Sequence, residues 1–151
     1  MKQLFFGLSA LSLLLSACTP QPVAIEYGAE ACIYCQMTIV DPKQGAEVVS
    51  DKGRVYKFDA IECLVNYLEQ HSEQPVALTL VNDYWNPGAF LSADTAFFLI
   101  SRNVPSPMGA FLSACGSKET ADAWLAEKGG TLYTYAELRA LHQRSGTWVN
   151  E

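Results

Sequence analysis

One pattern of strands and helices occurs twice along the chain, and it limits the choice of fold more than any other feature. In its first copy, apolar strands at residues 46–50 and 54–58 flank a turn at residues 51–53, where Gly53 can take a positive φ. The helix that follows, to about residue 71, has apolar residues at helical spacing along one face. The pattern predicts a hairpin that packs against a helix.

The start of this helix has a signature of its own. Asp59 precedes the apolar run and Glu62 follows three residues later, which is a variant of the capping box. We therefore predict that Asp59 caps the helix with Glu62 as its partner. A strand at residues 76–81 comes next, and residues 82–88, which contain Asn, Pro and Gly, are predicted to form a loop.

The second copy has strands at residues 96–101 and 108–114, joined by a loop with two prolines, and a helix from Ser117 that ends at Gly129-Gly130. A short strand at residues 132–133 and a helix opened by a Thr134–Glu137 capping box close the chain. The sequence predicts an α+β fold with tandem ββα units, a mostly antiparallel sheet, and a closing strand and helix.

The first residues indicate export. Lys2 is followed by an uncharged apolar run from Leu4 to Leu15, which is too short to span a bilayer comfortably, and then by small residues. We predict a signal peptide at residues 1–17. Because Cys18 directly follows Ser16-Ala17, this segment is similar to a bacterial lipobox, in which lipid is attached to the cysteine. The alternative is an ordinary signal peptide followed by an unrelated cysteine.

The predicted division of the chain follows from that cleavage. Residues 18–29, rich in Pro and Gln at their start, are predicted to form a lipidated tether, and residues 30–151 the folded domain. Of 151 residues, the 134 that follow residue 17 are enough for one domain with a real core.

Charge and residue types exclude several classes of function. Without Lys2, nine basic residues face sixteen acidic ones, and no basic patch suggests a nucleic-acid partner. The sequence contains no phosphate-binding loop and no Ser/His/Asp set. His71 and His142 lie near predicted helix C-termini, where a cation favours the helix dipole, so we interpret them as structural, with His142 as a copper ligand the minority alternative. These features favour a binding protein over an enzyme.

The stretch ACIYCQMTIVD, residues 31–41, carries the chemistry. Cys32 and Cys35 form a C-x-x-C motif, but residue 36 is Gln, so the motif lacks the His of covalent haem attachment. The β-branched residues that follow make a poor helix, unlike a thioredoxin-type site, and a closed zinc site would need four ligands. Met37 adds a thioether, which suits Cu(I), and in extended backbone it would share a face with Cys35.

The residue types alone leave alternatives open. Exported cysteines tend to pair, so Cys32 and Cys35 could form a structural disulfide beside a core methionine, or hold another metal. Met108 follows a proline-rich loop, and a methionine there could reach a distant site or pack against the neighbouring sheet.

The sequence resembles the NosL family, the accessory lipoproteins of nitrous oxide reductase assembly. The resemblance covers nearly the whole chain after residue 17 and rests on the order of its segments. These segments are the lipobox ending at Cys18, Tyr34-Cys35-Gln36-Met37, YKFDAIECLVNYL, Val81-Asn82-Asp83 followed by Trp85, LSADTAFFLI, Pro107-Met108-Gly109 and GSKETADAWLAEKGG.

The resemblance implies a periplasmic, membrane-anchored Cu(I)-binding metallochaperone that supplies copper for maturation of nitrous oxide reductase. It implies a pair of ββα units and carries the copper ligands over to Cys35 and Met108, with Met37. Cys32 departs from the family's simplest pattern, and could be a second thiolate ligand or a disulfide partner of Cys35. Cys63 and Cys115 are also outside that pattern, and we interpret them first as small buried apolar residues, with Cys63 as an extra ligand or redox partner the minority alternative.

The implied partners are a copper enzyme, either nitrous oxide reductase or another acceptor, and a membrane reached through the N-terminal lipid. Two chains could share one copper ion in a homodimer. Thr19, in place of an aspartate after the lipidated cysteine, favours the outer membrane. The competing function is an exported thiol–disulfide oxidoreductase using Cys32 and Cys35, and a third is a structural lipoprotein with disulfides.

Overall fold

The computed structural model describes residues 19–146. The predicted signal peptide at residues 1–17 and the predicted lipidation of Cys18 lie outside this range. The elements, in chain order, are β1 (Ala46–Ser50), β2 (Val55–Phe58), α1 (Ile61–Gln70), β3 (Val76–Asp83), β4 (Asn86–Ser92), β5 (Phe97–Ile100), β6 (Leu112–Cys115), α2 (Lys118–Lys128), β7 (Thr131–Tyr133) and α3 (Tyr135–Ser145).

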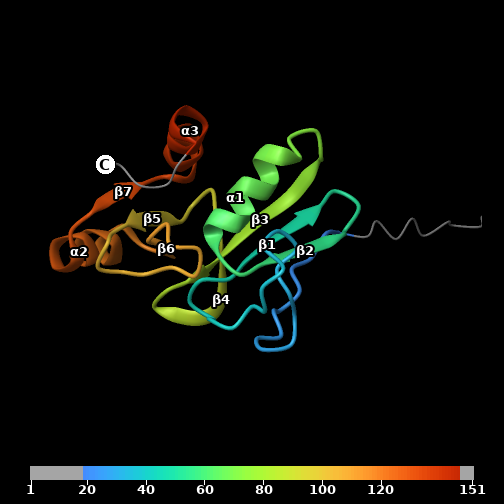
Figure 1. Cartoon of the computed structure of the whole chain (residues 1–151), viewed down its shortest axis with the longest axis horizontal. Coiled ribbons are helices and arrows are strands. Elements are labelled where there is room, and N and C mark those ends of the chain that lie inside the picture. Colours follow the sequence, from blue (N-terminus) through green and yellow to red (C-terminus); the bar gives the residue numbers. More distant parts are fainter. Residues whose placement is uncertain (1–18, 147–151) are drawn as a thin grey trace, which may run out of the picture.

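The strands form two antiparallel sheets (Figure 1). The first has the order β2-β1-β3-β4, and the second has the order β6-β5-β7. In the first sheet, β1 is buried along its whole length because it lies between β2 and β3. This arrangement confirms the predicted α+β fold, with its ββα units and closing strand and helix.

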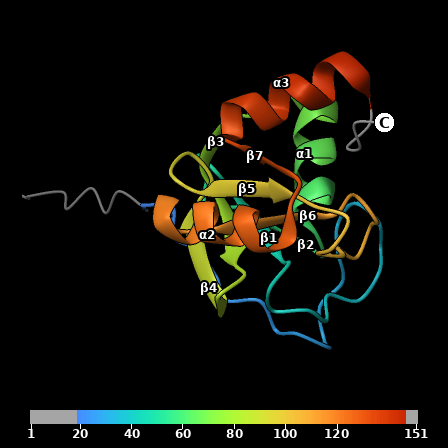
Figure 2. The same cartoon turned by 90° about the vertical axis from the view of Figure 1, so that its left-hand side faces the viewer.

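Helix α1 lies where the two sheets meet. It contacts β1 and β2 of the first sheet and β6 of the second, and β3 also contacts β6. Its buried face includes Ile61, Leu64 and Val65, which join one apolar core with residues of both sheets, such as Phe58 and Phe98. Figure 2 shows α2 alongside β5, with α3 at the opposite end of the molecule from the N-terminal loops.

Strand β4 corrects the prediction of a loop at residues 82–88. Residues Asn86-Pro87-Gly88 begin this strand, and only Tyr84 and Trp85 form the turn before it. Because β4 is an edge strand, one side of it needs no backbone partner, so a proline is tolerated there. Turn-forming residues in this segment therefore gave the wrong prediction.

The return strand of the second unit starts later than predicted. Strand β6 begins at Leu112, whereas residues 101–111 form a loop that carries Met108. Gly109 has φ +76° and Phe111 has φ +58°, and both angles are incompatible with a strand. Met108 thus lies on a loop and not within a strand.

The two predicted capping boxes had different outcomes. Thr134 and Glu137 form theirs in full, as predicted. The prediction for α1 was wrong: the capping position is Ala60, and no side chain caps the helix. The Glu62 side chain is bonded instead to the loop that carries Met108.

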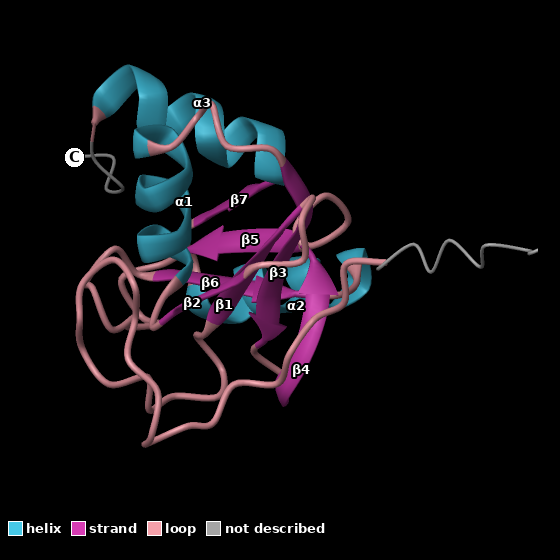
Figure 3. Cartoon of the chain, turned by 90° about the vertical axis from the view of Figure 1, so that its right-hand side faces the viewer, coloured by secondary structure: helices cyan, strands magenta, loops and turns pink. Residues whose placement is uncertain are grey.

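The chain before residue 46 wraps one side of the first sheet, and Figure 3 shows these long loops on the side away from α3. Ordered contacts begin early, since the Val23 N–H donates to Glu47 Oε1 at 2.9 Å and Ile25 is buried in the core. The predicted boundary between tether and domain, at residue 30, stays a prediction.

Candidate metal centre

Cys32, Cys35 and Met37 lie on one tight loop. A bridge between Ala31 and Thr38 closes it, and inside it the Cys32 N–H donates to the Met37 carbonyl at 2.8 Å. Gln36 has φ +64°, so the backbone between Cys35 and Met37 is not extended. The expectation that extended backbone places these two side chains on one face was therefore wrong.

This loop is held against the end of strand β2. The Ile33 N–H donates to the Lys57 carbonyl at 3.0 Å, and the Lys57 ammonium forms an ion pair with Glu30 at 2.7 Å. Helix α1 begins four residues after Lys57, and Cys63 lies in its first turn. The β2–α1 connection therefore brings Cys63 to the cysteine loop.

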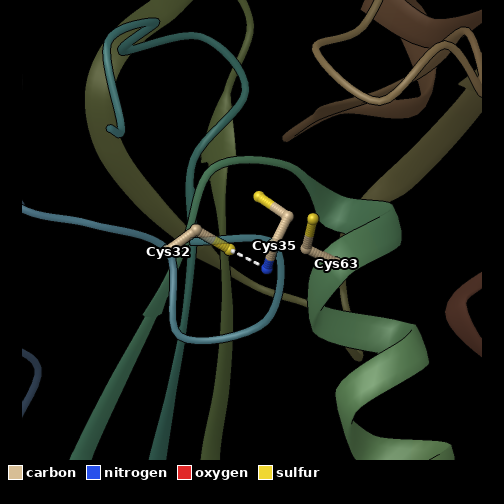
Figure 4. Close-up of side chains that lie close together, drawn as sticks. All are labelled: Cys32, Cys35 and Cys63. Carbon is tan, nitrogen blue, oxygen red and sulfur yellow. Dashed lines mark hydrogen bonds between the residues drawn. The ribbon is translucent and has the colours of Figure 1, made fainter. Parts of the chain in front are cut away.

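The three thiols face one another in one cluster (Figure 4). The Sγ atoms of Cys32, Cys35 and Cys63 all lie within 4.8 Å of one another, and all three residues are free cysteines. Cys32 and Cys63 are 0% exposed, whereas Cys35 is partly exposed. The cluster is thus buried on one side and reaches solvent through Cys35.

The environment of the cluster favours a thiolate at Cys32. The Cys63 thiol donates a hydrogen bond to Cys32 and holds the Cys32 pKa well below its ordinary value, helped by backbone N–H groups that include that of Cys35, 3.4 Å from Cys32 Sγ. The same contact raises the pKa of Cys63, and burial raises the pKa of Cys35. Without metal, the negative charge of the cluster therefore lies on Cys32, beside the protonated thiols of Cys35 and Cys63.

This donor set suits a soft metal ion. Thiolates bind Cu(I), zinc and iron–sulfur clusters, while three sulfurs without a nearby histidine leave a zinc site one ligand short of its usual four. Among residues 19–146, these three cysteines are the group of His, Cys, Asp and Glu side chains close enough together to hold one ion. The chemistry of the site is therefore that of sulfur ligation.

The two predicted methionine ligands are surface residues. Met37 is 43% exposed and Met108 is 41% exposed, so neither is a core side chain. Met37 belongs to the cysteine loop itself, and the Met108 loop is bonded to Glu62, the neighbour of Cys63 in α1. Their assignment as ligands stays a prediction.

Cys63 is the residue that the sequence interpretation undervalued, because it was taken first as a small buried apolar residue. It is buried, yet its sulfur faces two other sulfurs. Cys115 fits the apolar interpretation, since it packs with Leu99, Val104 and Trp124. A cysteine in the first turn of a helix, just after a hairpin, was the only sequence signal available for Cys63.

Comparison with known proteins identifies the family to which this chain belongs. The sequence profile of the NosL family matches residues 22–141, which is most of the chain. The chain belongs to the NosL family. No curated protein sequence matches it.

A solved structure shares the fold of this NosL family member. The crystal structure of the copper chaperone NosL from Shewanella denitrificans aligns with a TM-score of 0.67 and 23% sequence identity, over 79% of this chain and 96% of that chain. None of the helices within residues 19–146 is long and apolar enough to cross a bilayer.

Proposed function

We propose that this protein is a copper chaperone that carries Cu(I) on the cluster of Cys32, Cys35 and Cys63. The observation that carries the proposal is the convergence of these three sulfurs at the edge of the core. Membership of the NosL family and the shared fold with a copper chaperone support it. Met37 and Met108 are the proposed thioether ligands on the exposed side.

The charge state of the cluster supports Cu(I) as cargo. A soft d¹⁰ ion binds thiolate and thioether sulfur readily and accepts two or three ligands without strict geometry. The Cys32 thiolate supplies one negative charge before the metal arrives, and the Cys35 and Cys63 thiols lose protons as they bind. Binding therefore releases protons and becomes weaker as pH falls.

A carrier must also release its metal. Cys35 is partly exposed and the two methionines are about two-fifths exposed, so a partner's ligands can approach the ion from that side. Cys32 and Cys63 are closed to solvent and hold the ion from behind. This is the arrangement of a site for transfer, with no reaction of its own to catalyse.

The family resemblance supports the rest of the proposal. The acceptor is nitrous oxide reductase or another exported copper enzyme. The lipid on Cys18 holds the protein at the periplasmic face of a bacterial membrane. Because residue 19 is Thr and not Asp, this is the outer membrane. Two chains could meet through their exposed methionines and share one ion.

The test is an anaerobic titration of the fully reduced protein with Cu(I) against a competing Cu(I) chelator. Wild type is expected to bind one ion per chain, or one ion per two chains where a homodimer shares it. Cys35→Ala is expected to weaken binding by more than about 100-fold, since the loss of a ligand exceeds the 10–100-fold typical of residues that support one. Cys115→Ala is the matched control, because it removes a buried thiol that lies outside the cluster.

Three results would contradict the proposal. Reduced wild type that binds no Cu(I) would rule out the carrier function. Binding that survives Cys35→Ala would place the metal elsewhere. Turnover of disulfide substrates that needs Cys32 and Cys35 would favour the oxidoreductase function, although these cysteines lie on a closed loop and not at a helix start.

A further inference from the structure

Met108 lies in a turn whose closure is well defined. The Gly109 N–H donates to the Ser106 carbonyl at 3.0 Å, which closes a four-residue turn over residues 106–109 with Met108 at its third position. Pro107 and Gly109, with φ +76°, suit the second and fourth positions of this turn. The position of Met108 therefore depends on what holds the base of the turn.

Glu62 is hydrogen-bonded to the residues at both ends of this turn. One carboxylate oxygen, Oε1, accepts a hydrogen bond from the Ser106 hydroxyl and another from the Ala110 N–H at 3.4 Å. Ser106 opens the turn and Ala110 follows it directly. The two bonds therefore join the turn to the first turn of α1, one residue from Cys63.

Gln44 makes a second set of hydrogen bonds to the chain around this turn. Its Nε2 donates to the Pro105 carbonyl at 3.3 Å and to the Ser113 hydroxyl at 2.9 Å. Gln44 lies seven residues after Met37. The loop that carries Met108 is thus bonded to the first turn of α1 through Glu62 and, just before the turn, to Gln44, which lies between the cysteine loop and β1.

The burial of Glu62 is costly, which makes a purely local role a poor explanation. The side chain is 1% exposed, and its second oxygen, Oε2, is buried without a hydrogen-bond partner. Capping of α1 does not account for it, because no side chain makes the cap bond of that helix. The Glu62 side chain instead accepts hydrogen bonds from Ser106 and Ala110, at the two ends of the Met108 turn.

We propose that Glu62 is a positioning residue for Met108, holding the 106–109 turn at the start of α1 so that the thioether meets copper bound by the cysteine cluster. This inference rests on the proposed function, and it adds to that function the residue that couples the methionine loop to the thiols. Hydrogen-bonded residues that support a metal ligand typically change metal affinity 10–100-fold.

The test is a double-mutant cycle with Met108→Leu and Glu62→Ala, measured as Cu(I) affinity against a competing chelator. Each single variant is expected to lose about 10–100-fold in affinity, Met108→Leu because a neutral thioether contributes less than a thiolate ligand, and Glu62→Ala because it supports that thioether. The affinity of the double variant is expected to equal that of the single variant with the lower affinity, since both substitutions act through the same thioether. Glu62→Gln is expected to retain the affinity, because the amide oxygen can still accept both hydrogen bonds.

X-ray absorption of the copper-loaded protein gives a readout that loss of stability alone would not change. The thioether sulfur contribution at copper is expected in wild type and in Glu62→Gln, and is expected to disappear in Met108→Leu and Glu62→Ala. Glu47→Ala is the matched control, because it removes another fully buried carboxylate, one that bonds the Val23 N–H far from the Met108 turn in sequence. It should leave the copper spectrum unchanged.

If Glu62→Ala does not fold, Ser106→Ala removes one of the two bonds and leaves the core intact. Losses in Glu62→Ala and Met108→Leu that multiply would overturn the inference, as would thioether ligation that survives Glu62→Ala. These outcomes leave the copper carrier intact, whereas a wild type that binds no Cu(I) removes both proposals.

Discussion

Cys63 and Cys115 are both buried near the junction of the second strand and the helix of their ββα units, and the comparison shows how the surroundings of the two thiols differ. Cys63 lies in the first turn of α1, after β2 has ended, whereas Cys115 is the last residue of β6, and each is 0% exposed. Cys63 faces two other thiols, whereas Cys115 packs among apolar side chains and donates a weak hydrogen bond to the Ser117 carbonyl at 3.7 Å.

The difference comes from a segment that only the first unit receives. The loop of residues 32–37 lies against the β2–α1 connection and brings two thiols to Cys63. Around Cys115, the neighbouring space is filled by Leu99 and Trp124. Burial is therefore the same at both positions, and the chemistry of the neighbours sets the role.

The largest expected difference is in copper affinity. Cys63→Ala should weaken Cu(I) binding by more than about 100-fold, because it removes a proposed thiolate ligand, while Cys115→Ala should change it less than about twofold. Competition with a Cu(I) chelator measures both. Equal losses in the two variants would mean that the cluster acts only as part of the core.

The next difference is in the acid–base behaviour of the metal-free protein. Cys63→Ala removes the thiol that lowers the Cys32 pKa, so the ultraviolet thiolate absorbance at neutral pH should fall, as it does in Cys32→Ala. Cys115→Ala should leave it unchanged, because burial raises the pKa of Cys115 to about 11 and keeps it protonated. A neutral-pH thiolate that depends on Cys115 would contradict this assignment.

The free energy of unfolding should also change with pH as the thiols of Cys32 and Cys115 titrate. Because the folded-state pKa of Cys32 lies below the ordinary value of 9.0, its contribution is complete above pH 9 and is lost as pH falls through the folded pKa. The contribution of Cys115 to the free energy of unfolding depends on pH in the opposite direction. Because its pKa is raised, this contribution is complete below pH 9 and is lost as pH rises through about 11. Urea unfolding of Cys32→Ala and Cys115→Ala, each compared with wild type at pH values below and above 9, measures how the contribution of each thiol to the unfolding free energy changes with pH.

The smallest expected effect is on packing. Cys115→Ala should cost about 1 kcal/mol of unfolding free energy at neutral pH, because it leaves a small cavity beside Trp124. Cys115→Val, which refills the space with apolar atoms, should cost less. Urea unfolding checks both variants, and a Cys115→Val protein less stable than Cys115→Ala would show that the thiol does more than fill space.

Local sequence signals predicted most of the fold. The Thr134–Glu137 box, the Ser117 cap and the hairpin turn at Gly53 act within a few residues, so the sequence reveals them directly. The errors arose where tertiary context decides. Pro87 is accepted in β4 because that strand is at the sheet edge, and the α1 cap lacks a side chain although Asp59 was available.

The candidate site was predictable only in part for the same reason. Cys32, Cys35 and Met37 are close in sequence, so their grouping was visible, but their geometry depends on the positive φ of Gln36. Cys63 enters through the docking of the loop on β2, which no local pattern encodes. The Glu62 contact with the Met108 turn spans more than forty residues and was equally hidden.

The one-sided exposure of the cluster has a kinetic consequence. If the proposed site holds copper, an incoming ligand can approach the ion only from the side of Cys35, because Cys32 and Cys63 are closed to solvent. Under the proposed function, the bonds on the exposed side, to Cys35 and the proposed methionine ligands, would yield first, and the bonds to the buried thiols would break only after the partner has engaged the metal. Small chelators that cannot reach past Cys35 would strip the ion slowly, while a docked partner would take it quickly at the same overall affinity.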